Sequence, residues 1–190
     1  HFEACYCADK AEALKKALEW IPAGSSVGWG GAMSAQQIGL LDTVRTGDYR
    51  ALDRERAATP EERRAIMKQC LGTDVFITGA NALSMDGQMV NIDGNGNRVA
   101  SSLYGHKKVW FIVGRNKLAP TYEEALWRAR NIAAPKNAQR LGRKTPCAVH
   151  GDRCYDCKSP ERICRGLVVL WEAVANMEME VVLIDQDLGY

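Results

Sequence analysis

Four cysteines near the end of the sequence are spaced as a metal-binding set. Cys147, Cys154, Cys157 and Cys164 fall within 18 residues in the pattern C-x6-C-x2-C-x6-C. Thiolates are preferred ligands of zinc and of iron–sulfur clusters, and two residues between a pair of cysteines let both sulfurs reach one centre. The spacing therefore predicts a metal-binding loop at residues 145–165 with these four cysteines as its ligands.

The pattern leaves two metal centres open. One close pair is flanked by two single cysteines, whereas a zinc ribbon usually has two close pairs. We expect a [4Fe-4S] cluster, because its larger body accepts ligands spread over a longer stretch, and zinc is the alternative. The same segment carries basic side chains that would offset the negative charge of a thiolate-bound cluster: Arg143, Lys144, Arg153, Lys158, Arg162 and Arg165.

The remaining cysteines are expected to be small core residues. They are Cys5, Cys7 and Cys70, and they bring the total to seven. An odd total argues against a complete disulfide framework, which a chain of this size with its own core does not need. We therefore expect a reducing, cytoplasmic environment.

Two polar segments, each following a predicted strand, indicate a pocket for a small anion. The glycine-rich turn at residues 28–34 offers backbone N–H groups, and residues 78–98 are rich in amide and carboxylate side chains. Arg98 is expected to clamp a carboxylate or phosphate with two parallel hydrogen bonds. We expect the ligand to be bound by Gly30, Gly31, Ser34, Asn81, Asn91, Asn97, Arg98, Asn116 and Lys117.

No nucleophile motif stands out, so the catalytic residue is unknown from sequence. The chain has neither a G-x-S-x-G elbow nor an H-E-x-x-H helix. The candidates for acid–base or polarising roles come from the polar segment and are Asn81, Asp86, Asp93 and Arg98.

Alternating strands and helices must position these residues. The clearest strands are expected at residues 26–29, 74–78, 89–92, 109–113, 167–171 and 181–184. Helices are expected at residues 9–20, from 34 onward, and at 60–71, 97–104 and 121–133, with Asp9 and Thr59 as the N-caps of the helices at 9–20 and 60–71. Continuous apolar strands separated by helices predict an α/β fold with a mainly parallel sheet, formed by one domain over residues 1–190.

Composition excludes two classes of protein. The chain has 190 residues and a net charge of +2, which is too balanced for a dedicated nucleic-acid binder. No apolar run approaches the roughly 20 residues that cross a bilayer, so no membrane span is expected. The charge is nevertheless uneven, because residues 115–165 hold 12 basic and 5 acidic side chains.

The sequence resembles the lactate-utilisation (LUD) domain family, in particular a stand-alone subgroup with a cysteine-rich C-terminal loop. The resemblance is carried by residues 28–34, 78–98, 131–135 and 145–164 and covers nearly the whole chain. It implies a Rossmann-like three-layer α/β sandwich of the coenzyme A transferase and sugar-phosphate isomerase superfamily. Residues 78–98 are also similar to the sugar-phosphate segment of methylthioribose-phosphate isomerases, where an aspartate stands at the position of Asn81.

Three functions follow as hypotheses. The first is an iron–sulfur protein of lactate-type organic acid metabolism that binds a small anionic ligand and relays electrons or activates substrate at the cluster. The second is a zinc-stabilised transferase or isomerase acting on a sugar phosphate or acyl-coenzyme A. The third is a regulatory or scaffold subunit of a redox complex. Iron–sulfur redox partner proteins are expected, and a homodimer is left open.

Overall fold

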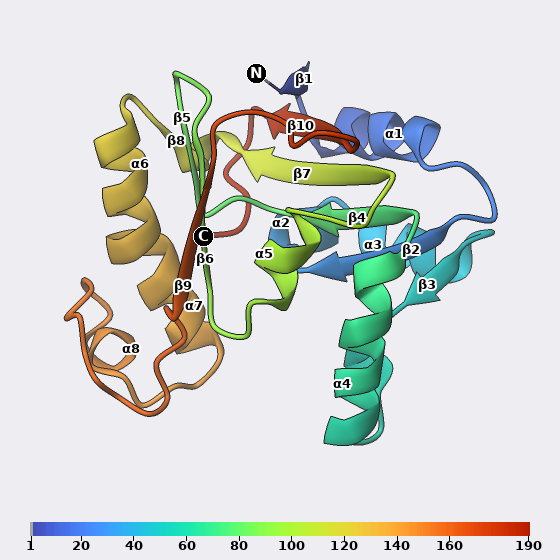
Figure 1. Cartoon of the computed structure of the whole chain (residues 1–190). Helices are drawn as coiled ribbons and strands as arrows, with labels where there is room; N and C mark the ends of the chain where they lie inside the picture. The colour runs from blue at the N-terminus through green and yellow to red at the C-terminus, as the bar shows by residue number, and fades with distance from the viewer. Residues whose placement is uncertain (1) are drawn as a thin grey trace.

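A computed structural model describes residues 2–190 as two packed β-sheets with flanking helices (Figure 1). The strands are β1 (Glu3–Cys7), β2 (Ser26–Gly30), β3 (Arg50–Leu52), β4 (Val75–Thr78), β5 (Ala82–Ser84), β6 (Met89–Asp93), β7 (Lys108–Gly114), β8 (Leu118–Ala119), β9 (Gly166–Leu170) and β10 (Glu178–Ile184). The α-helices are α1 (Lys10–Trp20), α2 (Met33–Gln37), α3 (Leu40–Thr46), α4 (Pro60–Gln69), α5 (Asn97–Ser101), α6 (Tyr122–Arg128), α7 (Ala134–Arg140) and α8 (Pro146–His150).

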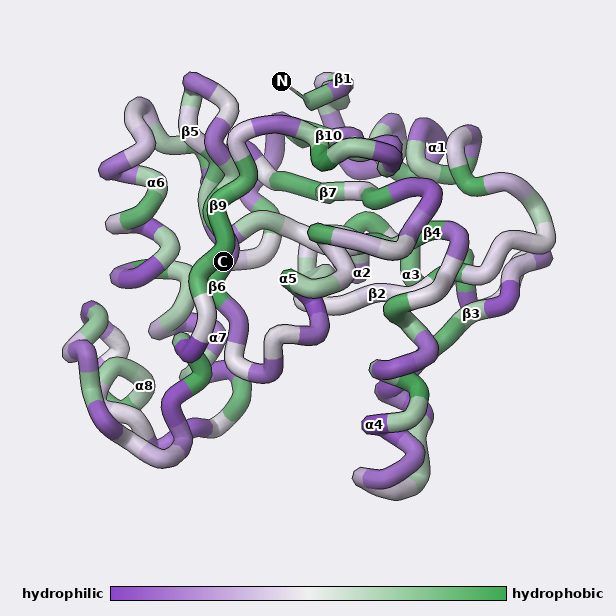
Figure 2. The backbone as a smooth tube through the Cα atoms, viewed as in Figure 1, coloured by the Kyte–Doolittle hydropathy of each residue, from purple (hydrophilic) through white to green (hydrophobic). Residues whose placement is uncertain are grey.

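The larger sheet has six parallel strands in the order β1-β10-β7-β4-β2-β3. Its central strand, β7, is a continuous apolar run that is buried on both faces and appears hydrophobic in Figure 2. Parallel strands join through helices, which accounts for the alternation seen in the sequence. The predicted α/β class with a mainly parallel sheet is confirmed.

Each face of the six-stranded sheet has its own core. On one face, Trp110 and Ile112 of β7 pack with residues of α1 and α3 such as Ala17 and Leu40. On the other face, Phe111 packs with apolar residues of the second sheet. Burying each large apolar side chain contributes about 1.5–3 kcal/mol, so these two clusters fix the position of the strand ends.

A second, four-stranded sheet was missed by the sequence analysis. Its order is β8-β5-β6-β9, with β6 antiparallel to both of its neighbours. The strands predicted at residues 89–92 and 167–171 belong to this sheet. The sequence analysis did not separate the two sheets, because a short buried strand has the same apolar pattern in either one.

Helix starts were easier to predict than helix ends. Asp9 accepts hydrogen bonds from the amides of Ala11 and Glu12, and Thr59 caps α4, as the sequence indicated. The helix predicted from residue 34 is instead split into α2 and α3 at Gly39, whose φ of 82° lies in the left-handed region. A short helix, α8, also lies inside the segment predicted to be an irregular loop.

The helix predicted at residues 121–133 continues to residue 140 through a π-helical turn, Ala129–Ala133. Pro135 follows this turn and has no backbone N–H to donate, so a regular α-helix cannot run through it unchanged. The π-helical turn contacts residues 145–165, which are called here the cysteine segment. Within residues 2–190, none of the helices is both long and apolar enough to cross a membrane.

Candidate functional site

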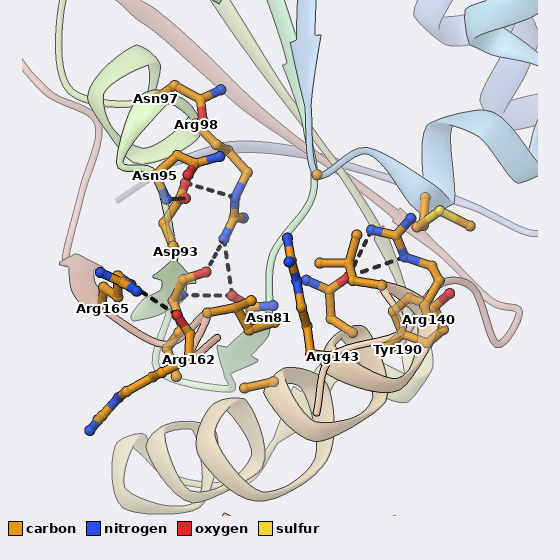
Figure 3. Close-up of a pocket in the computed structure, with 18 of the residues that line it drawn as sticks. Asn81, Asp93, Asn95, Asn97, Arg98, Arg140, Arg143, Arg162, Arg165 and Tyr190 are labelled. Carbon is orange, nitrogen blue, oxygen red and sulfur yellow. Dashed lines mark hydrogen bonds and ion pairs between the residues drawn. The ribbon is translucent and has the colours of Figure 1, made fainter. Parts of the chain in front are cut away.

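A cavity of about 740 Å³ lies where the parallel strands end. Gly31 follows β2, Asn81 follows β4 and Lys117 follows β7, and all three line the cavity. The carboxyl ends of parallel strands form the usual ligand crevice of an α/β sheet. Helix α7 and the segment at residues 160–165 form the other wall (Figure 3).

The lining of this cavity, called here the anion cavity, is strongly basic. Its acidic residues are Glu55, Asp93 and Glu161. Its basic residues are Arg54, Arg63, Arg98, Lys117, Arg140, Arg143, Arg162 and Arg165. This surplus of cations favours a negatively charged ligand.

Arg98 is the central residue of one side of the anion cavity. This side, called here the floor, comprises Gly79, Asn81, Asn91, Ile92, Asp93 and Arg98. The Arg98 guanidinium donates to the backbone carbonyls of Gly79 (3.1 Å) and Ile92 (2.6 Å) and to the side-chain oxygens of Asn91 (2.7 Å) and Asn81 (3.1 Å). Its Nε lies 3.6 Å from an Asp93 carboxylate oxygen. The guanidinium is thus used internally, which corrects the expectation that it clamps a ligand with two hydrogen bonds. Arg98 instead links the loop after β4 to strand β6.

The polar residues predicted in the 78–98 segment form further hydrogen bonds within this floor. The Asn81 side-chain oxygen also accepts from the amide of Ile92 at 2.7 Å, and Asn91 accepts from the amide of Asn81 at 3.1 Å. The Asp93 carboxylate accepts from backbone amides at the start of α5. Asn81, Asp93 and Asn97 line the cavity, whereas Asn91 is buried behind it.

The side chains of Ser34 and Lys117 contact each other near the carboxyl ends of the parallel strands. Lys117 is only 4% exposed, and its Nζ donates to the Ser34 hydroxyl at 3.1 Å. Burial, with a smaller contribution from the cations Arg128 and Arg98, lowers the pKa of Lys117 to about 7. At neutral pH this amine is therefore partly uncharged.

The other predicted site residues lie outside the cavity lining. Gly30 packs against Arg98 and Phe76, where a side chain would be crowded. The Asn116 side-chain oxygen accepts from the amide of Leu188 at 3.0 Å and so fastens the C-terminal segment. Asp86 is exposed in the turn between β5 and β6, so the structure does not bring it to the other candidates.

Sequence reasoning missed most of the cationic wall. Arg54 and Arg63 come from the connection before β4, and Arg140 and Arg143 come from the end of α7. Figure 3 places Arg140 and Arg143 across the cavity from Arg98. The signal that could have found two of them is the basic excess of residues 115–165, which was noted but not connected to the pocket.

The four predicted metal-ligand cysteines line one small second cavity, called here the cysteine cavity. Arg130 of the π-helical turn and Arg162 also line it. All four cysteines are unpaired and partly buried. Within residues 2–190, the structure has no group of three or more cysteine, histidine or carboxylate side chains already arranged around a single-ion position.

Neighbouring side chains already orient these thiols. The Thr145 hydroxyl lies 3.3 Å from the Cys147 sulfur, and the Arg130 guanidinium donates to the Cys154 sulfur at 3.9 Å. Asn131, in the same π-helical turn, accepts from the amide of Cys154 at 3.2 Å. π-Helical turns often occur at functional sites, and this one presents two consecutive residues to the cysteine segment.

Arg162 organises the second half of the cysteine segment. It donates to the backbone carbonyls of Cys157 and Cys164, both at 2.9 Å, and lies 3.1 Å from an Asp156 carboxylate oxygen. Arg162 and Ile163 line the anion cavity as well as the cysteine cavity, and so does Ala134 at the start of α7. The two cavities therefore share a wall.

Cys5, Cys7 and Cys70 lie outside the cysteine cavity. Cys70 is buried in the core behind the six-stranded sheet. Burial raises the pKa of Cys5 to about 12, with Cys7 and Glu180 adding to the shift, and burial also raises the pKa of Cys7. None of the three lines either cavity described above.

Comparisons with known proteins agree with this architecture. Residues 1–184 match the model of the LUD domain. A crystal structure of a DUF162 family protein from Deinococcus radiodurans superposes with a TM-score of 0.51 at 13% identity, covering 96% of this chain and 88% of that one. At this identity the likeness extends to the fold alone.

Ribose 5-phosphate isomerases superpose over less of the chain. The enzyme from Neisseria gonorrhoeae gives a TM-score of 0.38 at 18% identity, over 60% of this chain and 54% of that one. The enzyme from Plasmodium falciparum gives 0.32 at 14% identity, over 58% and 52%. A search of curated protein sequences found no match.

Proposed function

Because the chain belongs to the LUD domain family, which implies a role in lactate utilisation, we propose that it is an iron–sulfur protein of lactate-type organic acid metabolism. In this proposal Cys147, Cys154, Cys157 and Cys164 hold a [4Fe-4S] cluster. The anion cavity binds a small organic acid beside it. The proposal has two parts, a metal centre and a ligand site, and each is supported by its own residues.

The cysteine cavity supports the metal centre. Four thiols from one segment line one cavity, and four thiolates, each binding a different iron, are the ligand set of a cubane cluster. Zinc would instead draw all four sulfurs to within about 2.3 Å of one ion. A bound cluster supplies one-electron transfer, and Arg130 and Arg162 would offset its negative charge.

The anion cavity supports the ligand class. Arg54 is a partly buried cation whose Nε has no hydrogen-bond partner within residues 2–190. Arg143 stands on the opposite wall, where Figure 3 draws it beside Tyr190. A carboxylate between such groups would gain charge-assisted hydrogen bonds, which are about twice as strong as neutral ones.

The observation that carries the proposal is the shared wall. Arg162 donates hydrogen bonds to the backbone carbonyls of Cys157 and Cys164 and also lines the anion cavity. An acid in the anion cavity would therefore lie next to the metal centre. This adjacency supports a redox role for the ligand more than a purely structural role for the metal.

Anaerobic purification followed by iron, acid-labile sulfide and zinc analysis tests the proposal. We expect iron and sulfide in about equal amounts and a brown protein, because four thiolates bind a cubane cluster. Cys157→Ser should lose most of the iron. The matched control is Cys70→Ser, which changes a buried cysteine that lies outside both cavities and should keep the iron.

The contradicting result is equally specific. A colourless protein that holds one zinc ion per chain after anaerobic preparation would replace the iron–sulfur centre with a structural zinc site. Retention of iron in Cys157→Ser at the wild-type level would show that the cysteine segment is not the metal site.

A further inference from the structure

The anion cavity contains a nucleophile that the proposed function does not use. Lys117 follows β7, lines the cavity and is buried, yet the charged groups that act on it are both cations, Arg128 and Arg98. A buried lysine usually pairs with a carboxylate, because an uncompensated buried charge is costly. Lys117 has a serine hydroxyl, that of Ser34, as its hydrogen-bond acceptor.

Glycine backbone approaches the end of this side chain on two sides. Gly189 approaches so closely that a Cβ at that position would stand 2.8 Å from the Lys117 Nζ, and one at Gly79 would stand 3.6 Å from it. Because both neighbours are glycines, the amine is enclosed by backbone and not covered by side chains on these sides. A side chain at either glycine would crowd the amine, whereas the anion cavity, which Lys117 lines, is the side from which a ligand would reach it.

The surroundings also keep the amine reactive. Desolvation and the two neighbouring guanidiniums bring the pKa of Lys117 to about 7, whereas an exposed lysine titrates near 10.5. Only the uncharged amine is a nucleophile, and a lysine desolvated beside another cation is a known means of activating one. Other cations of the cavity lining, such as Arg54 and Arg143, are suited to hold a carboxylate in the same cavity.

We propose that Lys117 captures 2-oxo acids in the anion cavity as a reversible imine. The Nζ bonds to the carbonyl carbon next to the carboxylate. The carbonyl oxygen then leaves as water with the two hydrogens of the amine, and hydrolysis reverses the step. The inference deepens the proposed function, since it names the ligand class of the same cavity, but it requires no metal.

Reductive trapping tests this directly. The full chain is incubated with pyruvate, 2-oxobutyrate or glyoxylate at neutral pH with sodium cyanoborohydride, which reduces an imine to a stable amine. Peptide mass spectrometry then locates the carboxyalkyl group. We expect labelling of Lys117 to exceed that of any other lysine by about tenfold or more, since at pH 7 a far larger fraction of it is uncharged.

Two variants make the result specific. Lys117→Arg keeps a cation but cannot form the imine, so it should lose the dominant label. Lys107→Arg is the matched control at the other end of β7, where Lys107 is exposed and pairs with Asp74 at 2.7 Å, and it should be labelled like the wild type. Circular dichroism checks that both variants are folded.

The pH profile separates a reactive lysine from an accidental one. Labelling of Lys117 should reach half of its maximum near pH 7, whereas labelling of the exposed lysines should still be rising at pH 9. The proposal is overturned if none of the three acids labels Lys117 above the exposed lysines. Because trapping works on protein without metal, this outcome is distinct from a failure to find iron and sulfide.

Discussion

The floor of the anion cavity and the cysteine segment are neighbours, but they are held in different ways. In the floor, Arg98 alone makes four hydrogen bonds to the loops after β4 and around β6, and the side chains that make them are nearly buried. In the cysteine segment, the four thiols are partly exposed; the Cys147 sulfur contacts the Thr145 hydroxyl, and the Cys154 sulfur accepts from Arg130 and from the amide of Asp156. The polar groups of the floor pair with one another, whereas the four free cysteine sulfurs remain available as metal ligands. This difference indicates that the floor is preorganised, and under the proposed function a bound metal centre would complete the cysteine segment.

Removing Arg98 should cause the largest change in the floor. Arg98→Ala leaves two carbonyls, two amide side chains and the Asp93 carboxylate without their cation, and unfolding should become easier by about 3 kcal/mol or more. Urea unfolding at pH 7 measures this. Arg98→Lys keeps the charge but has fewer donors, so its free energy of unfolding should lie between those of the wild type and Arg98→Ala. A loss below about 1 kcal/mol would show that the floor does not depend on this residue.

Lys117, beside the floor, should make the stability of the protein depend on pH. Its pKa is lowered in the folded state, so between about pH 7 and pH 10.5 the unfolded chain binds more protons and stability rises with pH. Below pH 7 both states are protonated, and the full cost of the buried charge is present. The free energy of unfolding of the wild type should therefore rise, relative to Lys117→Met, by up to about 1.4 kcal/mol per pH unit in this window.

Unfolding in urea at several pH values between 7 and 9.5 measures this slope. Lys107→Met changes an exposed lysine that precedes β7. Its free energy of unfolding should change with pH in parallel with that of the wild type. Parallel curves for the wild type and Lys117→Met would mean that Lys117 keeps an ordinary pKa.

Loss of a cysteine ligand should act locally. Cys157 belongs to neither core cluster of the six-stranded sheet, so Cys157→Ser should change the free energy of unfolding by less than about 1 kcal/mol. Without its bound group, residues 145–165 should open more often and be cleaved faster by trypsin, whose sites there include Arg153 and Lys158. Equal cleavage rates with and without metal would break the contrast between the two regions.

Asp86 lies in neither region and should give the smallest effect. It is exposed in the turn between β5 and β6, so Asp86→Ala should change stability by less than about 0.5 kcal/mol and leave pyruvate binding unaltered. Isothermal titration calorimetry and urea unfolding provide the check. A loss of binding would place this turn in the site after all.

The comparison also explains what the sequence could predict. Motifs whose members lie close in the chain were found, because Cys154-x-x-Cys157 and the caps at Asp9 and Thr59 depend on local spacing. The parallel sheet followed from its continuous apolar strands. The second sheet and the cationic wall were not found, because they join residues such as Arg54 and Arg143 that are distant in sequence and are brought together only by packing. Arg98 was correctly placed near the cavity, but local sequence does not show that its donors are already satisfied.

The most direct test of the central claim, that the two regions act on one another, is the EPR spectrum of the anaerobically purified and chemically reduced protein with and without pyruvate. We expect a cluster signal that changes when pyruvate saturates the protein, since Arg162 lines both cavities, and that does not change with a neutral analogue such as pyruvamide. A cluster signal that stays the same while calorimetry shows pyruvate bound, or an absence of pyruvate binding, would contradict the account.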